Sequence, residues 1–395
     1  MKLSLPQPTL LCLLSVTLGL ASCQLPEEGA TVRRAESAGA GNLYEGAGAL
    51  NVPTRGSAIN NVARMLAGME AYGGQTAFAQ VRDSSAWPMH QRSMDTLWRS
   101  HENGRGGLVR AWAADEIGDL QQHRALFYPF SGPDFLFAHE LFPSAETYIL
   151  CGLEPAEPLP NLTTLSPGEI ASGLSGLRSS LSSIMQAGYF VTKDMRSEFQ
   201  STRFRGVLPV LLAFIARTGN TVDSVDIVTV DAMGNTVLAG AHRGAAPGLM
   251  IRFRSGWGQS KRLFYFQQDL SNGGVRPGGP FLTFISKQGY PPALVKSASY
   301  LMHEEGFSNI RNYLTHSCQG IVQDPSGVPY QAIIRASLSL NLYGNYQGTL
   351  GIFGQQQPDL VAAYQLRKHA VKPVNFGFGY LYNASNTSIM VARRR

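Results

Sequence analysis

The chain contains 395 residues, of which 44% are hydrophobic and 15% are charged, which is ample for a large α/β domain with a buried core. Its 42 glycines and 22 prolines indicate many turns without a collagen-like or disordered composition. The formal charge of +6 is dispersed, with clusters at Arg33 and Arg34 and at Arg393–Arg395. A nucleic-acid-binding protein more commonly has a basic stripe interleaved with aromatic residues, so we predict no nucleic-acid partner.

The N-terminus has the pattern of an export signal. Met1 and Lys2 form a short basic segment, Leu10–Leu20 is apolar, and the small residues Ala21 and Ser22 follow. The apolar run is too short to cross a bilayer comfortably and ends in a cleavage site, as signal peptides do. An ordinary secretory peptide that is cut near Ala21 is one interpretation of this pattern.

A second interpretation rests on residues Leu20–Cys23, which resemble the lipobox of bacterial lipoproteins. The resemblance implies that residues 1–22 are a signal peptide and that Cys23 becomes the acylated first residue of the mature chain. Gln24 stands where that family's inner-membrane retention signal has Asp, which favours the outer membrane. Residues 23–56 lack apolar periodicity, so we predict a flexible tether. We therefore expect a bacterial cell-envelope protein whose partner is the membrane, reached through a lipid anchor.

Two cysteines would remain in such a mature chain, because Cys12 leaves with the signal peptide and Cys23 is acylated. They are Cys151 and Cys318, each in or beside a predicted buried strand. A disulfide between them is one alternative in an oxidising envelope. We favour free, buried thiols, because neither cysteine lies in a cysteine-dense scaffold.

Residues 57–395 are predicted to form a single α/β domain. Its first part carries three amphipathic runs, which predict helices that begin at Ser57 and that cover about Trp87–Ser100 and Val109–Gln122. We expect these helices to cover one side of a sheet that begins at Ala125.

A strand, a turn, a short helix and a second strand follow in residues 124–158. Ala125–Phe130 and Thr147–Leu153 are continuous apolar runs, as in strands that are buried on both faces. Pro133 is expected at the first position of a helix over Phe135–Phe142, where its missing N–H costs nothing. Two parallel strands joined by a helical crossover are the simplest interpretation.

The rest of the chain alternates further predicted helices and strands. Ser166 and Glu169 have the spacing of a capping box and predict a helix that continues to about Ala187. Further helices are expected at Val207–Arg217, Phe281–Gln288, Phe307–His316 and Leu360–His369, and strands at Tyr189–Thr192, Val225–Val230, Thr236–Ala239, Gly248–Arg254, Lys261–Leu270, Ala293–His303, Gly320–Gln323 and Asn375–Tyr382. The predicted fold is a Rossmann-like α/β architecture, with a largely parallel central sheet, flanking helices and an antiparallel extension.

Polar residues at the predicted strand ends are the candidates for a functional site, because open α/β sheets bind ligands beyond the carboxyl ends of their parallel strands. The candidates are Ser131, Gly132, Asp134, Glu154, Asp231, His303 and Asp324. Ser131, Asp134 and His303 are the candidate catalytic residues of a hydrolase, and the other four are candidate ligand-binding residues. Each also has an ordinary explanation as a turn-former or cap. No pair of Cys or His residues has the spacing of a metal site, so none is predicted.

The predicted strand–helix–strand unit between Ala125 and Glu154 also resembles the nucleotide-binding start of Rossmann-like methyltransferases. The resemblance implies that Ser131 and Gly132 form the turn that faces the ligand and that Glu154 meets a ribose hydroxyl. The family's glycine-rich G-x-G turn is missing and Pro133 interrupts this one, so we predict no cofactor. Export is a second objection, because the family's usual cytoplasmic cofactor is not supplied outside the inner membrane. A shared ancestral fold that has lost cofactor binding would reconcile the resemblance with both objections.

Three functions follow as hypotheses from the sequence. The first is a lipid-anchored envelope protein with a binding or structural task. The second is an envelope hydrolase that uses Ser131, Asp134 and His303, and the third is a degenerate methyltransferase-type domain.

Overall fold

The computed structural model describes residues 58–72, 79–160, 162–188, 204–239, 246–381 and 383–394. All of these residues belong to the unit Gly46–Arg395. The predicted signal peptide, lipobox and tether lie outside the described residues, and so does the strand predicted at Tyr189–Thr192. These four features therefore stay predictions.

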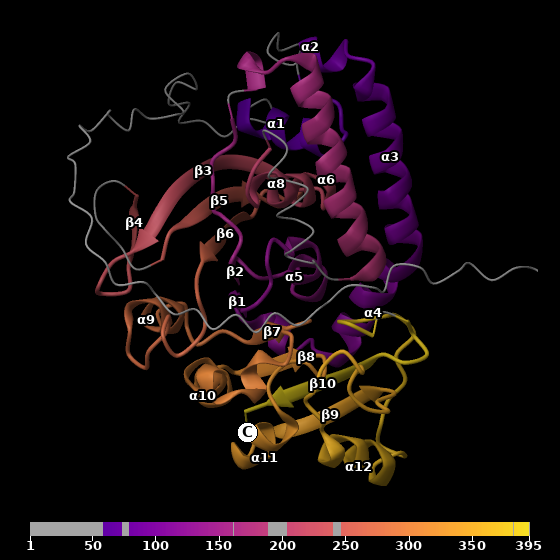
Figure 1. The fold of residues 1–395 in the computed structure, drawn as a ribbon, viewed down its shortest axis with the longest axis vertical. Helices are drawn as coiled ribbons and strands as arrows, with labels where there is room; N and C mark the ends of the chain where they lie inside the picture. Colours follow the sequence, from indigo (N-terminus) through magenta and orange to yellow (C-terminus); the bar gives the residue numbers. More distant parts are fainter. Residues whose placement is uncertain are drawn as a thin grey trace, which may run out of the picture. The chain divides into compact units, whose positions relative to one another are not determined.

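A ten-stranded sheet runs through the described residues in the order β4-β3-β5-β6-β2-β1-β7-β8-β10-β9 (Figure 1). The strands are β1 (Ala125–Tyr128), β2 (Thr147–Gly152), β3 (Thr221–Val230), β4 (Thr236–Leu238), β5 (Gly248–Arg254), β6 (Ser260–Gln267), β7 (Ala293–Val295), β8 (Gly320–Gln323), β9 (Ser339–Gly344) and β10 (Ser388–Arg393). The five central strands, from β6 to β8, are parallel. The strands outside them pair antiparallel on both sides. The predicted Rossmann-like α/β fold is therefore confirmed.

Side chains that alternate along the central strands fill a separate core on each face of the sheet. In β1, Leu126 and Tyr128 belong to one core and Phe127 to the other. The first core is closed by α1 (Ala58–Leu66), α2 (Ala79–Arg82), α3 (Ala86–His101), α4 (Gly107–Glu116), α5 (Phe135–Leu141), α6 (Pro167–Ala187) and α8 (Leu208–Arg217), and the second by α9 (Pro280–Ser286), α10 (Ser308–Ser317) and α11 (Tyr330–Arg335). A smaller cluster packs α12 (Pro358–Leu366) against β9 and β10. Burial on both faces explains why these strands have continuous apolar sequences.

The turn after β1 differs from its prediction in the residue that starts the helix. Asp134 is the N-cap of α5, and its Oδ1 accepts a hydrogen bond from the Phe137 amide at 3.1 Å. Phe135 is therefore the first helical residue, and the prediction that Pro133 takes this position is wrong. A carboxylate at the N-cap satisfies a free amide of the first turn, which proline at that place cannot do.

The strand predicted at Ala293–His303 is wrong beyond Val295, where β7 ends. Ser297, Ser299 and Tyr300 have φ angles of 54°, 52° and 57°, which a strand does not accommodate. Apolar residues continue past the strand because the loop that follows is itself largely buried. The apolar pattern therefore reflects packing at this place rather than strand pairing.

The closing strand predicted at Asn375–Tyr382 is also wrong. Phe378 and Leu381 form an isolated bridge there, and the last strand of the chain is β10, which pairs with β8 on one side and β9 on the other. Phe378 is buried, and its ring centroid lies 6.3 Å from that of Phe137. This segment is aromatic because it covers α5, which it does as a loop.

Other local predictions are confirmed. The Ser166 hydroxyl accepts from the Glu169 amide at 3.3 Å, and the Glu169 carboxylate accepts from the Ser166 amide at 2.9 Å, which completes the capping box of α6. Cys151 and Cys318 are free and buried. Within the described ranges, no helix combines the length and the apolarity needed to cross a bilayer.

His90, on α3, should make the stability of the fold sensitive to acid. Its ring is fully buried, with Nε2 3.0 Å from the Leu66 carbonyl oxygen, and burial lowers its pKa from 6.5 to about 4. Below pH 6.5 the unfolded chain binds a proton that the folded chain refuses, so stability falls as the pH falls. Between pH 7 and pH 5, this residue should account for about 2 kcal/mol of the loss. His90→Gln should remove that part in urea denaturation at the two pH values, and an unchanged pH dependence would contradict the assignment.

Candidate ligand-binding site

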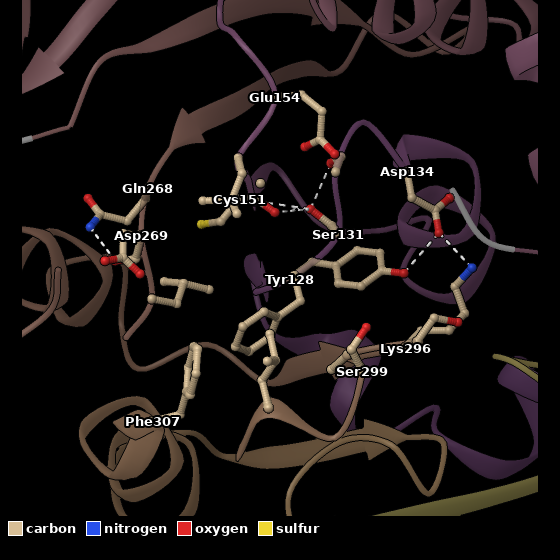
Figure 2. A pocket seen from close by; sticks show the side chains of 18 of the residues that line it. Tyr128, Ser131, Asp134, Cys151, Glu154, Gln268, Asp269, Lys296, Ser299 and Phe307 are labelled. Atoms are coloured by element: carbon tan, nitrogen blue, oxygen red, sulfur yellow. Dashed lines mark hydrogen bonds and ion pairs between the residues drawn. The ribbon is translucent and has the colours of Figure 1, made fainter. Parts of the chain in front are cut away.

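A cavity of about 370 Å³ lies at the carboxyl ends of β1, β2, β6 and β7 (Figure 2). Numbered in chain order, the parallel strands β6-β2-β1-β7-β8 have the order 3-2-1-4-5, so the order reverses between β1 and β7. Doubly wound folds bind their ligands at this point of reversal. The cavity lies there, and its volume is that of a small-molecule site.

Ser131 ties the loop after β1 to the end of β2. Its hydroxyl oxygen accepts from the Cys151 amide at 3.0 Å and lies 2.8 Å and 3.1 Å from the carbonyl oxygens of Gly132 and Cys151. These partners are all main-chain atoms, and none of the hydrogen bonds recorded for Ser131 reaches a base. Ser131 therefore fixes the turn, in which Gly132 takes a φ of 51° that favours glycine.

Glu154, just after β2, directs its carboxylate towards this turn (Figure 2). Its Oε2 accepts from the Tyr265 hydroxyl at 3.1 Å, and the side chain is 4% exposed. A Cβ atom on Gly132 would lie 3.7 Å from Oε2, which is an ordinary contact distance. A Cβ atom on Gly152 would collide with Oε2 and would lie 2.6 Å from the Tyr265 hydroxyl. Glycine at position 152 therefore makes room for the Glu154 carboxylate.

A buried ion pair forms the floor of the cavity. Lys296 Nζ lies 2.7 Å from Asp134 Oδ2, and the Tyr128 hydroxyl donates to the same oxygen at 2.8 Å (Figure 2). Nζ also donates to the Gly188 carbonyl oxygen and lies 3.8 Å from the centre of the Phe137 ring. Burial lowers the pKa of Lys296, while the adjacent Asp134 acts in the opposite direction. The charges of the floor thus compensate each other.

The loop after β7 is held in a strained conformation beside the cavity. Asp324 accepts from the Ser297 amide at 3.2 Å and from the Tyr380 amide at 3.4 Å, and burial raises its pKa to about 6. The Tyr380 hydroxyl lies 2.7 Å from Ser299 Oγ and donates to the Ser297 carbonyl oxygen at 3.0 Å. Four of the six described non-glycine residues with positive φ line or flank the cavity: Phe130, Ser297, Ser299 and Tyr300. Such strain is concentrated at functional sites in proteins.

The loop after β6 gives the cavity a wall that is polar at one side and apolar at the other. Gln268 is buried, whereas Asp269 is exposed and accepts from the Ser271 amide at 2.8 Å. Leu270 and Phe307 continue the wall with apolar side chains. This part of the cavity therefore offers hydrogen-bonding groups beside an apolar surface.

The structure brings together four of the seven residues predicted for a site, since Ser131, Gly132, Asp134 and Glu154 all line the cavity. Asp324 lies behind the loop after β7 and supports it, as described above. Asp231 and His303 are not among the residues that line the cavity.

Asp231 lies in the turn between β3 and β4. Its carboxylate accepts from the amides of Met233 and Asn235 at 2.9 and 2.8 Å, and these bonds, chiefly the Asn235 amide, lower its pKa. His303 follows the loop after β7, where its ring packs against Tyr300 and burial lowers its pKa to about 4. Ser131 and His303 therefore do not line the same cavity, and the structure shows no hydrogen bond between these two described residues.

Among the lining residues that were not predicted for a site are five with large polar side chains: Tyr128, Gln268, Asp269, Lys296 and Tyr380. A signal existed for Gln268 and Asp269, because they follow the apolar residues Leu263–Phe266 as Glu154 follows the apolar run before it. Lys296 lies beyond the true end of β7, inside the strand that was predicted at Ala293–His303. Tyr380 lies inside the predicted strand Asn375–Tyr382, which does not form.

No group of three or more His, Cys, Asp or Glu side chains that could hold a metal ion occurs among the described residues. No family model, no curated protein and no solved structure matches the chain.

Proposed function

We propose that the protein is a lipid-anchored protein of the bacterial envelope whose Rossmann-like domain binds a nucleoside-type small molecule that carries no phosphate group. The lipid anchor is inferred from residues Leu20–Cys23 alone. The ligand class is inferred from the cavity at the reversal of strand order.

The position of Glu154 favours a ribose. In doubly wound folds, an acidic residue at the end of the second strand accepts hydrogen bonds from the ribose hydroxyls. Glu154 follows β2, lines the cavity and faces the turn after β1. The loop after β6 then offers acceptor oxygens of Gln268 and Asp269 to the polar edge of a base, since Gln268 Nε2 already donates to main-chain carbonyl oxygens. Leu270 and Phe307 supply the apolar surface.

The single observation that carries the proposal is the position of Asp134. Dinucleotide-binding folds hold pyrophosphate on the free amides of the helix that follows the first strand. Here the Asp134 carboxylate occupies that helix end and accepts a hydrogen bond from the Phe137 amide. Among the described residues that line the cavity, Lys296 is the one cation, and it is paired with Asp134. A phosphate would meet a carboxylate at this place, whereas an uncharged ribose would not.

The fold supports a ligand of this class. β10 runs antiparallel between β8 and β9, so the seven strands from β6 to β9 have the chain order 3-2-1-4-5-7-6. Rossmann-like methyltransferases, which the β1–β2 unit resembles, share this order and use a nucleoside-containing methyl donor. A fold does not determine a reaction, so we propose binding alone.

Isothermal titration calorimetry of the full chain tests the proposal with adenosine, S-adenosylmethionine and adenosine 5′-monophosphate. We expect adenosine or the sulfonium compound to bind at least about tenfold more tightly than the monophosphate. Glu154→Gln should weaken binding about tenfold or more, because it replaces a charge-assisted hydrogen bond to the ribose. The parent should bind 2′-deoxyadenosine more weakly than adenosine. The Glu154→Gln variant should bind the two compounds with similar affinities, because the hydrogen bond to the ribose is already weakened.

Asp231→Asn is the matched control, because this carboxylate belongs to a turn outside the cavity. It should leave the affinity unchanged. Tighter binding of the monophosphate, or flat heat flow with all three compounds, would refute the proposed ligand class.

A further inference from the structure

Trp257 stands at the tip of the β5–β6 hairpin with 98% of its surface exposed. By contrast, Trp87 and Trp112 are 5% and 8% exposed. Gly256 and Gly258 flank the exposed residue, and Gly258 has a φ of 81°. Tryptophan has a large ring with an apolar body and a polar N–H, and it is enriched at interfaces that are apolar on one side and wet on the other.

The surroundings of the tip combine aromatic and cationic side chains. Arg254, Gly256 and Gly258 of the hairpin share a polar cavity with Arg64 and Tyr72 of the N-terminal part. Tyr72 is 40% exposed, and the Arg64 guanidinium lies 4.0 Å from the centre of its ring. Tryptophan and tyrosine beside arginine are the side chains that gather at the interface between a membrane and water.

The tip lies at the end of the sheet opposite to the ligand cavity. The hairpin joins the carboxyl end of β5 to the amino end of β6, whereas the cavity lies beyond the carboxyl end of β6. A surface that covered Trp257 would therefore leave the cavity open.

The chain also enters the described body at this end. Arg64 belongs to α1, which begins at Ala58, and Asn60 of the same helix accepts from the Val222 amide of β3 at 3.0 Å. Cys23 precedes Ala58 by 35 residues (58 − 23). A chain of that length reaches at most about 3.5 Å per residue, or about 120 Å in all, so an acyl group on Cys23 would keep the body within that distance of its bilayer.

We propose that this end of the body, with Trp257 and Tyr72 as its aromatic residues, docks on the interface of the phospholipid bilayer. The proposal rests on the lipid anchor of the proposed function. The indole of Trp257 enters the headgroup region, and Arg64 faces lipid phosphates beside it. Arg254 is paired with Asp223 at 2.9 Å, so the aromatic side chains carry most of the contact. Docking in this way directs the ligand cavity away from the membrane.

Bromine-labelled lipids test the docking directly, because bromine quenches an indole that it contacts. The chain is isolated from the membrane fraction and reconstituted into phosphatidylethanolamine–phosphatidylglycerol vesicles, with or without brominated acyl chains. The emission of Trp257 is obtained by subtracting the tryptophan fluorescence of the Trp257→Phe variant from that of the parent. We expect brominated lipid to lower this emission about twofold. Met233→Ala is the matched control, since Met233 is 70% exposed on the β3–β4 turn, and it should keep the full quenching.

The outcomes for the anchor and for the docking are separate. Mass spectrometry of the isolated chain shows whether Cys23 carries acyl chains, and an unmodified Cys23 overturns the anchor. If the acylated chain binds to vesicles and brominated lipid does not lower its Trp257 emission, the docking is overturned. Folded chain that stays in the supernatant, or a second copy that covers Trp257 in solution, overturns it as well.

Discussion

Replacing Lys296 by methionine should lower the free energy of unfolding by about 3–5 kcal/mol, the usual cost of removing one partner from a buried ion pair. The side chains of Lys296 and Asp134 are 1% and 2% exposed, and their charged atoms lie 2.7 Å apart. Without the ammonium group, the buried Asp134 carboxylate keeps the Tyr128 hydroxyl and the Phe137 amide as donors but has lost its cation. Urea denaturation followed by tryptophan fluorescence measures the change.

Two further variants separate the unpaired charge from other effects of the substitution. The double variant Lys296→Met/Asp134→Asn should be more stable than Lys296→Met alone, because no unpaired charge stays buried. Lys372→Met is the control for an exposed pair, since Lys372 is 57% exposed and lies 2.7 Å from Glu116. That variant should lose less than about 1 kcal/mol. An equal loss in Lys296→Met and Lys372→Met would refute the importance of the buried pair.

The same pair explains why the floor of the cavity carries charge at all. A buried ion pair is weak support for stability, because desolvation consumes most of its attraction. Apolar residues would fill the space below β1 and β7 at less cost. Asp134 and Lys296 instead present two opposite charges and the Tyr128 hydroxyl to a cavity, as binding sites do. Burying this ion pair costs stability, and that cost is expected where the charged groups are kept to bind a ligand.

The centre of the fold could be predicted from the sequence because its strands are long apolar runs between clear breakers. β2 is such a run, and Glu154 could be placed at its end. The loop after β7 could not be predicted, because Ser297, Ser299 and Tyr300 adopt positive φ angles under tertiary constraint. The backbone there is held by Asp324 and Tyr380, and a local pattern contains no information on contacts with such distant residues.

The site could be predicted only where a residue follows a correctly placed parallel strand. Asp134 and Glu154 meet this condition. Asp269 was missed because the sequence of its strand does not show a parallel partner: β6 pairs antiparallel with β5 on one side and parallel with β2 on the other. Tyr380 was missed because it reaches Ser299 across 81 positions of the chain. Partners on both edges of a strand are a property of the sheet and are not encoded in the strand's own periodicity.

Gly152→Ala should abolish adenosine binding and lower the free energy of unfolding by about 1–3 kcal/mol, the cost of inserting a methyl group into a packed site. The new Cβ would collide with Glu154 Oε2, and it would lie 2.6 Å from the Tyr265 hydroxyl and 3.0 Å from the Gly132 Cα. The carboxylate must therefore leave the place from which it faces the turn after β1. Calorimetry with adenosine and urea denaturation of the same preparation measure the two effects separately.

Gly168→Ala is the matched control for this change, because a Cβ atom on Gly168 meets no atom within 4 Å. Gly168 lies in the first turn of α6, where alanine is the better helix former, so this variant should be as stable as the parent or up to about 1 kcal/mol more stable. It should bind adenosine as the parent does. If Gly152→Ala kept the parent's affinity, the Glu154 carboxylate would not be a contact of the ligand, and the ribose assignment would fail even if the variant were destabilised. If both glycine variants lost affinity alike, the loss would not come from the cavity.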